Sequence, residues 1–444
     1  MASSELAQSL EGSGIRFVRV LWCDNANVIR AKALATRKVG AESLEHGVGI
    51  SAAQMGIPVD RDVLVAESGL SPVGEVRLVP DWPTLVPLPY APGHARVLGD
   101  MVKDGKPWPY CPRAFLKRVL ADYASEGVEV MAAFENEFYL LKAGTNGLEP
   151  VDRTNFASTL AMDVSRSVID DVAEALAAQK IPVEQYYAES GTGQHELTVR
   201  YTTALAAADR QIAFRETVRA VAMRHGLRAS FLPKIFADQA GSGCHLHLSL
   251  WKDGKNLTPN ADGPGLSPQG KSFVAGLLQH LIALLAFTTP TNNSFRRLKP
   301  RSWAGAFRCW GYDNREAAVR VPTDALGRST SVELKTCDAT ANPYLALGAV
   351  LTAGLDGLRQ KLTPPEPVQA DPANLSDDER KKKGAYPLPA NLTGALNQFS
   401  ADTVLIKALG PELAQAYLAV RHAEWQTMAK LELADEVKLL LERY

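Results

Sequence analysis

The stretch AFENEFYL, residues 133–140, alternates bulky apolar residues with two acids and predicts a β-strand. In a strand, residues two positions apart point to the same face, so Glu135 and Glu137 place two carboxylates side by side. Like charges among apolar neighbours are costly unless something neutralises them. The pair is therefore either a solvated strand face or a pair of oxygen ligands for hard divalent cations.

A second acidic segment follows at residues 184–201, EQYYAESGTGQHELTVRY. Glycines at 191 and 193 predict a tight turn, and Glu196 lies near the start of the alternating strand that follows it. Glu189 and Glu196 can then converge from opposite sides of the turn. Acidic residues that flank a surface turn are also commonplace, so this segment alone leaves both interpretations open.

A third segment, GSGCHLHLSLW at residues 241–251, combines a glycine-rich turn with two histidines. His245 and His247 share one strand face, and Gly241 and Gly243 leave a backbone that can approach a substrate closely. Together with four carboxylates, a histidine ligand gives a mixed oxygen and nitrogen site. Such a donor set favours Mg²⁺ or Mn²⁺ over zinc.

Basic residues are dense in three later segments: NSFRRLKPR (293–301), DNREAAVRVP (313–322) and SVELK (331–335). Arginines that follow metal-type carboxylates suit phosphoryl transfer, because its transition state spreads negative charge over the phosphoryl oxygens. The alternative is a solvated basic face. Residues 317–321 alternate as a strand does, so the side chain of Arg320 is expected to point in one defined direction.

One apparent nucleotide motif is set aside. Residues 265–272, GLSPQGKS, satisfy the phosphate-loop pattern, but that loop must follow a buried parallel strand. The preceding residues 256–264, NLTPNADGP, are polar and turn-forming. Ser272 is instead predicted to lie near the start of a helix that continues over residues 273–287.

Length, charge and cysteine usage narrow the function classes. The 444 residues carry 48 Lys and Arg against 49 Asp and Glu, a net charge of -1, which provides no field for nucleic acid or an anionic membrane. The polar N-terminus lacks the core of a signal peptide and no apolar run reaches about 20 residues, so a cytoplasmic protein is expected. Five scattered cysteines predict reduced thiols and neither disulfides nor a zinc site.

The chain divides at a proline-rich segment, residues 106–112. We predict a β-rich domain over residues 1–106, with strands at 15–22 and 75–80, and an α+β catalytic domain over residues 107–444. Residues 362–390 are predicted to form a surface loop before closing helices at 393–442. The catalytic domain is predicted to hold helices at 112–125, 158–180, 203–225, 271–288 and 342–360, and strands at 128–141, 193–201, 244–250, 316–321 and 331–335.

Residues 110 to 360 resemble the glutamine synthetase family. The E-x-E strand, the E-x6-E turn, G-S-G-x-H-x-H, P-T-x-N-S-[FY]-x-R-L, N-R-x-A-x-x-R and the run NPYLA at 342–346 stand in family order. The resemblance implies a small β-grasp-like N-terminal domain and a funnel-shaped antiparallel catalytic sheet flanked by helices. It also implies a homo-oligomer of stacked rings, with active sites between neighbouring subunits.

The resemblance further implies a role for each matching residue. Two metal ions per site are expected, and the substrates are expected to be ATP, glutamate and a nitrogen nucleophile. Glu137, Glu189 and Glu196 look like ligands of one ion, Glu135, His245 and Glu333 like ligands of the other; Glu184, Tyr201, His247, Ser249 and Arg320 fall where the family contacts ATP; Gly241, Gly243, Arg297, Arg315 and Lys335 fall at the acid substrate and the transferred phosphate.

Three positions depart from the family pattern. Lys335 stands where an arginine holds the substrate α-carboxylate, so charge is kept and bidentate geometry is lost. Ala240 replaces an asparagine, and Ser331 replaces an arginine near ATP. These departures leave open which acid the protein activates.

Three functions remain: a γ-glutamyl amide ligase acting on an organic amine, a glutamine synthetase using ammonia, and an oligomer without catalysis. Ligand-competent residues at all six metal positions argue against the third. The resemblance implies that ammonia-using relatives bind ammonium with a glutamate at the position of Trp303, assisted by an aspartate from the N-terminal domain of a neighbouring subunit. The segment aligned with that aspartate, residues 48–54, VGISAAQ, holds no acid. An indole offers an amine an apolar wall and a π-face, so we favour the amine ligase with Trp303 in the site. The alternative is that Trp303 only packs and another acid serves as base.

Overall fold

The computed structural model describes residues 8–10, 12–38, 46–145 and 147–444. Among these residues, the N-terminal part forms one sheet in the order β2-β1-β5-β4-β3, with β6 beside β5. β1 and β5 pair in parallel and their other neighbours are antiparallel. The strands are β1 (Phe17–Cys23), β2 (Ile29–Ala35), β3 (Val48–Ser51), β4 (Glu75–Pro87), β5 (His94–Lys103) and β6 (Lys106–Pro107).

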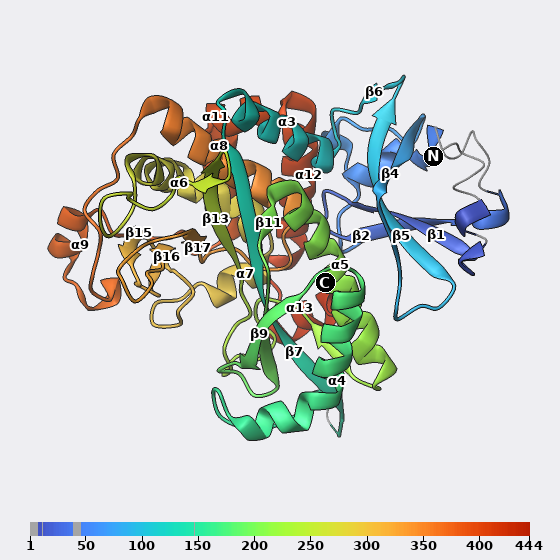
Figure 1. Ribbon diagram of the computed structural model, residues 1–444, viewed down its shortest axis with the longest axis horizontal. Coiled ribbons are helices and arrows are strands. Elements are labelled where there is room, and N and C mark those ends of the chain that lie inside the picture. Colours follow the sequence, from blue (N-terminus) through green and yellow to red (C-terminus); the bar gives the residue numbers. More distant parts are fainter. Residues whose placement is uncertain (1–7, 11, 39–45, 146) are drawn as a thin grey trace.

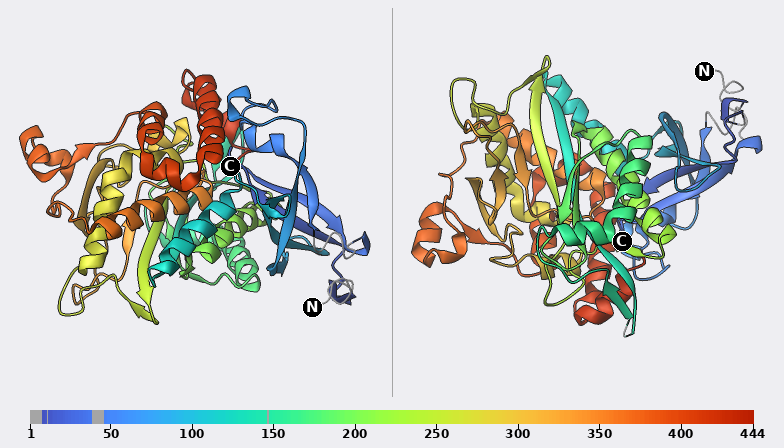
Figure 2. Two further views of the ribbon diagram at one scale, coloured as in Figure 1. Left: turned by 90° about the horizontal axis from the view of Figure 1, so that it is seen from above. Right: turned by 60° about the horizontal axis from the view of Figure 1, so that its bottom comes forward.

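The N-terminal sheet forms because its strands alternate. Val18 and Val20 of β1 are fully buried and pack with Leu78 of β4 in a separate hydrophobic cluster. The strands predicted at 15–22 and 75–80 are confirmed as β1 and β4. In the part of these connections that the structure describes lie three short 3-10 helices, η1 (Thr36–Lys38), η2 (Ala52–Gly56) and η3 (Ala66–Ser68). This sheet makes up one end of the molecule (blue in Figures 1 and 2).

The second sheet carries the predicted chemistry. Its main path runs β18-β15-β16-β17-β13-β7-β10-β9. The expectation of an antiparallel sheet is wrong for one pair, because β15 and β16 run parallel. The strands are β7 (Glu129–Gly144), β8 (Gly147–Pro150), β9 (Val183–Ala188), β10 (Gln194–Val199), β11 (Thr202–Thr203), β12 (Arg228–Ser230), β13 (Cys244–Lys252), β14 (Lys255–Asn256), β15 (Phe307–Tyr312), β16 (Ala317–Val321), β17 (Val332–Leu334) and β18 (Tyr386–Pro387).

Helices flank this sheet (Figure 1), and the five predicted for the catalytic domain up to residue 360 are confirmed within a few residues. The helices are α3 (Pro112–Ser125), α4 (Thr159–Ala178), α5 (Ala204–Arg224), α6 (Pro268–Thr288), α7 (Asn292–Arg297), α8 (Pro343–Gln360), α9 (Asp377–Lys383), α10 (Leu392–Ala401), α11 (Thr403–Leu409), α12 (Pro411–Met428) and α13 (Leu433–Leu440).

Helix α6 begins inside the phosphate-loop pattern. Ser267 caps it by accepting from the N–H of Gly270 at 3.0 Å, so the glycine and the residues after it form the first helical turns. Helix α6 is long and apolar enough to cross a membrane, but 78% of that window is buried within the protein. It is therefore a core helix, packed against α8 and α10.

The segment at 362–390 is only partly the predicted loop. It contains η4 (Pro372–Asn374) and the short helix α9, which Ser376 and Glu379 cap reciprocally. The closing helices are confirmed as α10 to α13. All five cysteines are buried and free, as predicted.

A buried arginine connects the N-terminal sheet to the helices beside the second sheet. Arg113, near the start of α3, bonds Asp81 of β4 at 2.8 Å and Asp100 of β5 at 3.0 Å. Its guanidinium also contacts both carboxylate oxygens of Asp209 in α5. The N-terminal sheet is thus fixed to the catalytic helices by a hydrogen-bonded ion cluster.

Candidate active site

The six predicted metal ligands line one cavity of about 410 Å³. Strand register explains their convergence. Glu196 of β10 stands opposite Glu137 of β7, and His245 of β13 stands opposite Glu135. Glu333 arrives from the other side of β13, on β17. The predicted convergence is confirmed as geometry; the members are Glu135, Glu137, Glu189, Glu196, His245 and Glu333.

His245 stands at the centre of this group. Its Nδ1 atom lies 3.3 Å from Glu333 Oε1 and 3.5 Å from Glu135 Oε2, and its Nε2 atom lies 3.6 Å from Glu137 Oε1. One imidazole therefore touches carboxylates of both predicted ligand sets. This spacing brings the two sets into a single continuous cluster.

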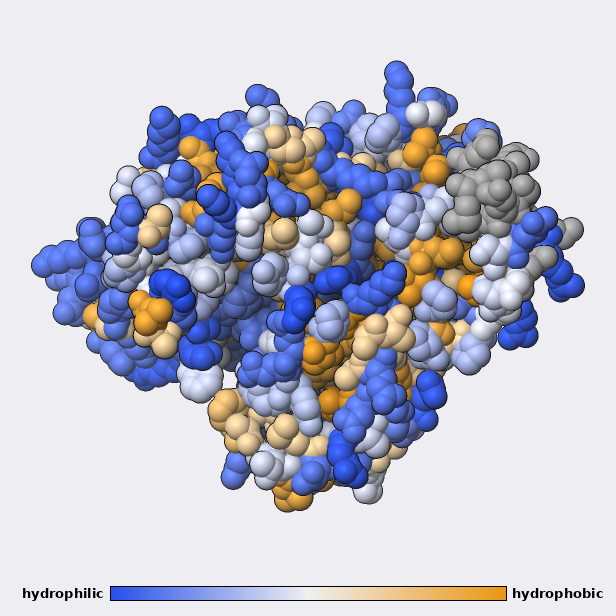
Figure 3. Space-filling model, in the orientation of Figure 1, coloured by the Kyte–Doolittle hydropathy of each residue, from blue (hydrophilic) through white to orange (hydrophobic). Residues whose placement is uncertain are grey.

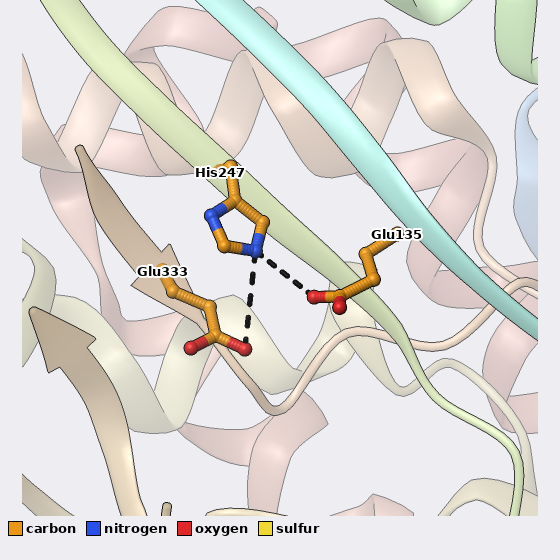
Figure 4. A group of neighbouring side chains, drawn as sticks. All are labelled: Glu135, His247 and Glu333. Atoms are coloured by element: carbon orange, nitrogen blue, oxygen red, sulfur yellow. Dashed lines mark hydrogen bonds and ion pairs between the residues drawn. The ribbon is translucent and has the colours of Figure 1, made fainter. Parts of the chain in front are cut away.

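His247 lies near two of these carboxylates, Glu135 and Glu333 (Figure 4). Its Nε2 atom is 2.9 Å from Glu135 and 4.0 Å from Glu333, and the three side chains offer ligand atoms within 4.8 Å of one another. The family resemblance implies a contact of His247 with ATP. The structure puts it at the border between the acidic cluster and a second cavity.

The turn before β10 sets the remaining acid. Gly193 has a φ of 72°, and a Cβ on Gly191 would meet the Tyr139 hydroxyl at 1.9 Å, so both positions require glycine. The turn places Glu189 on the cavity wall facing Glu196. The convergence predicted from this segment is confirmed.

Burial and mutual repulsion govern the charges here. Burial, with the Glu189 charge next, raises the pKa of Glu137 to about 7. Burial raises the pKa of Glu196 too, helped by a hydrogen bond with Glu135. Although burial opposes it, hydrogen bonds to His245 and His247 hold the pKa of Glu135 well below its usual range. Carboxylates that repel one another around an imidazole fit hard divalent cations.

Three cationic side chains line the same cavity: Arg297, Arg315 and Lys335. Arg297 is buried, and its guanidinium donates to the Lys335 carbonyl at 2.9 Å and contacts His245 Nε2 at 3.2 Å. Lys335 Nζ lies 3.3 Å from Glu333. The cavity therefore holds positive charge beside the acidic cluster.

Gly241 and Gly243 lie tightly against neighbouring protein groups, Arg297 among them, so neither position has space for a side chain. A Cβ on Gly241 would meet the Pro233 carbonyl oxygen at 2.6 Å, and one on Gly243 would meet His245 Nε2 at 2.5 Å. The Gly243 N–H donates to Glu137 Oε2 at 2.8 Å. The glycines thus let the backbone approach protein groups closely, and Gly241 also lines the cavity.

A second cavity of about 580 Å³ opens on the other side of Glu135. Four of the five residues predicted to contact ATP line it: Glu184, Tyr201, His247 and Ser249. Arg320 lines neither cavity; it donates to Glu333 Oε2 at 3.0 Å and so lies behind the acidic cluster. Glu135 lines both cavities and forms part of the wall between them.

Three aromatic residues that were not predicted from the sequence also line the two cavities. Phe156 and Tyr187 line the acidic cavity with Trp303, and Trp251 lines the second with Tyr201. Tyr187 precedes Glu189 by two residues, so period-two alternation could have placed it on the same face. Phe156 lies between β8 and α4 without a regular pattern, and no sequence signal marked it.

Comparison with known proteins assigns both parts of the chain to one family. The glutamine synthetase N-terminal domain family matches residues 1–108, and the glutamine synthetase catalytic domain family matches residues 109–439. The gamma-glutamylpolyamine synthetase GlnA3 of Streptomyces coelicolor is 38% identical over 431 residues, covering 95% of this chain and 92% of that one. Type-1 glutamine synthetase 1 of Dictyostelium discoideum is 34% identical, covering 97% and 90%.

Solved structures agree along the full length. A GmaS/ADP complex superposes with a TM-score of 0.86 at 31% identity and covers 100% of both chains. A ligand-free GmaS structure gives 0.85 at 32% identity and covers 98% of both. The chain belongs to the glutamine synthetase family and is an ATP-dependent carboxylate–amine ligase that uses divalent metal ions.

Proposed function

We propose that the protein joins glutamate to an organic primary amine, with cleavage of ATP to ADP and phosphate. The observation that carries this choice of nucleophile is an aromatic wall in the acidic cavity. The Phe156 ring meets Tyr187 edge-on at 6.0 Å and meets Trp303 edge-on at 6.3 Å. Phe156 and the two rings that meet it edge-on offer both apolar contact for an alkyl group and π-faces for its ammonium group.

Ammonium would gain less from this wall. It has no alkyl part to bury, and its hydration is lost without a carboxylate at the Trp303 position to offset the cost. The similarity to a gamma-glutamylpolyamine synthetase supports an amine, whereas the similarity to glutamine synthetases is compatible with ammonia. The aromatic wall therefore supports the organic amine, where sequence similarity alone favours neither of the two functions.

The acidic cluster holds the metal ions in this proposal. Glu137, Glu189 and Glu196 bind one ion, and Glu135, His245 and Glu333 bind the other, with His247 close enough to Glu135 to reach the same region. Bound Mg²⁺ or Mn²⁺ neutralises the ATP phosphates and polarises the terminal phosphoryl group. Without cations, the buried carboxylates repel one another, which supports a site built for them.

The cations of the same cavity hold the acid substrate. Lys335 binds the α-carboxylate of glutamate, and Gly241 provides backbone beside the substrate. Arg297 and Arg315 contact the γ-carboxylate and the phosphoryl group that it accepts. The γ-carboxylate attacks the terminal phosphorus and forms γ-glutamyl phosphate and ADP; the amine then displaces phosphate and gives up a proton. No protein nucleophile takes part.

The second cavity binds the nucleotide. Tyr201 and Trp251 stack at 6.2 Å with an interplanar angle of 28°, and this pair gives the adenine an aromatic platform. Glu184, His247 and Ser249 add polar contacts, and Arg320 acts on the phosphates through its position behind Glu333. A GmaS structure contains ADP, which supports a nucleotide site in this fold. The γ-phosphate would then lie at Glu135, where the two cavities meet.

Assembly into rings completes the proposal. In this arrangement the N-terminal sheet contacts a neighbouring subunit and helps close its active site, and the protein works in the cytoplasm. Figure 3 shows hydrophobic surface gathered between the N-terminal sheet and the catalytic part of one face. Apolar surface of this kind supports a subunit contact.

One assay tests the nucleophile. We would measure phosphate release with ATP, Mg²⁺ and glutamate, and compare kcat/KM for ammonia, methylamine, ethanolamine, isopropylamine and a polyamine at fixed pH. An organic amine is expected to exceed ammonia. Ammonia ahead by tenfold or more would make the protein a glutamine synthetase, and no phosphate release with any nucleophile would leave the oligomer without catalysis.

A further inference from the structure

The loop that carries Trp303 has an unusual backbone. Between α7 and β15, Arg301 has a φ of 60° and Trp303 a φ of 57°, both in the left-handed region that non-glycine residues rarely adopt. Two such residues in one short loop cost free energy that the surroundings must offset. Something outside the loop therefore stabilises it.

Glu316 supplies that restraint. Its Oε2 atom accepts the N–H of Arg301 at 3.0 Å, and its Oε1 atom accepts the N–H of Trp303 at 2.8 Å. One carboxylate thus binds both left-handed residues, and it is only 7% exposed. A carboxylate suits the task because both of its oxygens accept and neither donates.

Glu316 is itself held rigidly. It directly precedes β16, and its N–H donates to Asn314 Oδ1 at 3.0 Å. The Asn314 amide donates in turn to the Val368 carbonyl at 2.7 Å. At the other end of the loop, Phe307 of β15 pairs with Ala317 of β16. The backbone that carries the Glu316 carboxylate is therefore anchored to the sheet at the end of the loop.

The Trp303 side chain has little else to position it. Trp303 as a whole residue is 52% exposed, and its indole meets the Phe156 ring edge-on. The direction of the indole is thus set largely by the backbone at Trp303, and Glu316 fixes that backbone. Loss of the restraint would let the loop relax and carry the indole away from the cavity wall.

We propose that Glu316 is a positioning residue for amine selectivity: it holds the Arg301–Trp303 backbone so that the indole forms the amine side of the cavity. This inference rests on the proposed function, since it assigns Trp303 to the amine. Glu316 lines neither the acidic cavity nor the second cavity, so it is not expected to contact ATP, glutamate or the amine. Selectivity would then depend on two residues, one in contact with the amine and one behind the loop.

The test variant is Glu316→Gln, which keeps the shape but turns one acceptor into a donor facing a backbone N–H. Its kcat/KM for the preferred amine is expected to fall roughly 2- to 30-fold, and no further than in Trp303→Ala, mainly through KM, while KM for ATP and for glutamate changes less than twofold. Glu379→Gln is the matched control, because Glu379 also accepts a backbone N–H, at 2.8 Å, in the exposed cap of α9. The control should leave all constants within twofold.

A double-mutant comparison separates positioning from general damage. If Glu316 acts through Trp303, Glu316→Gln changes amine KM less than twofold when Trp303 is already alanine. Hydrogen exchange should also become faster at residues 299–305 in Glu316→Gln alone. An unchanged amine KM in Glu316→Gln, or equal effects with and without Trp303, overturns the inference. The amine panel on the unaltered enzyme tests the proposed function separately, so the two failures differ.

Discussion

The Nδ1 atom of His245 lies 3.3 Å from a carboxylate oxygen of Glu333, although strand register pairs Glu333 with His247. The imidazole of His245 on β13 therefore contacts β17 one pair away from its directly opposite residue. This diagonal contact links two strands that belong to different hairpins. Glu333 is 1% exposed and also bonds Arg320 and Lys335. It is the most deeply buried carboxylate of the acidic cluster.

Glu333→Gln should lower kcat by at least about 100-fold, because an amide is a poor ligand for Mg²⁺ and Mn²⁺. Titration calorimetry with Mn²⁺ should show one tight site fewer. Glutamine is preferable to alanine, since a full truncation would leave buried Lys335 unpaired. The matched control is Glu424→Gln, a buried acid that pairs with Arg421 at 2.8 Å. The control should lower the melting temperature without loss of a metal site; a full Mn²⁺ complement in Glu333→Gln would contradict the assignment.

Divalent cations should stabilise the folded protein. The clustered carboxylates repel one another without metal, and a ligand that binds only the folded state adds about 2.7 kcal/mol at 100 times its Kd. Thermal melts with Mg²⁺ or Mn²⁺ should therefore have higher midpoints than melts in EDTA. A higher midpoint with Ca²⁺ alone does not test this prediction, which concerns Mg²⁺ and Mn²⁺. Midpoints that stay fixed with both ions, with and without ATP, would remove the metal cluster from the proposal.

Trp303→Ala should weaken the use of an organic amine. A cation–π contact contributes about 0.5 to 2 kcal/mol, so kcat/KM for the amine should fall roughly 2- to 30-fold. The constants for ATP and glutamate should stay near their original values. Tyr386→Ala removes another exposed aromatic residue, on β18, and serves as the control. An unchanged amine constant in Trp303→Ala would assign Trp303 to packing alone.

Tyr201→Ala should weaken nucleotide binding. Stacking of a base on an aromatic side chain contributes about 1 to 3 kcal/mol, which corresponds to a roughly 5- to 150-fold rise in the Kd of ATP. Equilibrium binding of a fluorescent ATP analogue measures this change. KM for glutamate and for the amine provides the internal comparison. A loss confined to the amine would place the adenine elsewhere.

Stability should depend on the protonation of His280. Its Nδ1 lies 2.6 Å from Asp402 and its Nε2 lies 3.1 Å from Asp356. Burial alone would lower the pKa of His280, but the two carboxylates raise it overall above 6.5. A raised folded-state pKa means that the folded protein binds the proton more tightly, so the stabilisation is complete below pH 6.5 and is lost as pH rises through the folded-state value.

His280→Gln should therefore lower the free energy of unfolding by about 1.5 to 3 kcal/mol at pH 6 and by clearly less at pH 9. Urea unfolding at both pH values measures the difference. The surface pair of His225 and Asp171, at 2.8 Å, gives a matched control. His225→Gln should cost at most about 1 kcal/mol. Equal losses at both pH values in His280→Gln would contradict the ion contact.

Alternation in the sequence predicted much of the fold. Strands β7, β10 and β13 carry their acids and histidines at period two, so the shared faces could be predicted before any pairing was known. The long helices were predictable from their length and from apolar residues that recur three and four positions apart. Helix α9 was missed because prolines surround it, although the cap formed by Ser376 and Glu379 is a readable start signal.

The contacts between distant segments could not be predicted in this way. Period two places His245 and His247 on one face but does not tell which one meets Glu333, because that depends on the register between β13 and β17. The restraint by Glu316 had no local signal either. Left-handed backbone usually falls on glycine, and here it falls on an arginine and a tryptophan.

Glu135 lies in the wall shared by the two cavities. In the proposed function, a purine-bearing compound and an amino-acid analogue bind on the two sides of Glu135. A single inhibitor that joins adenosine to a glutamate analogue through a short phosphonate bridge is then expected to occupy both cavities at once. Its two halves would act at high effective concentration toward each other, so the joined compound should bind far more tightly than either half alone.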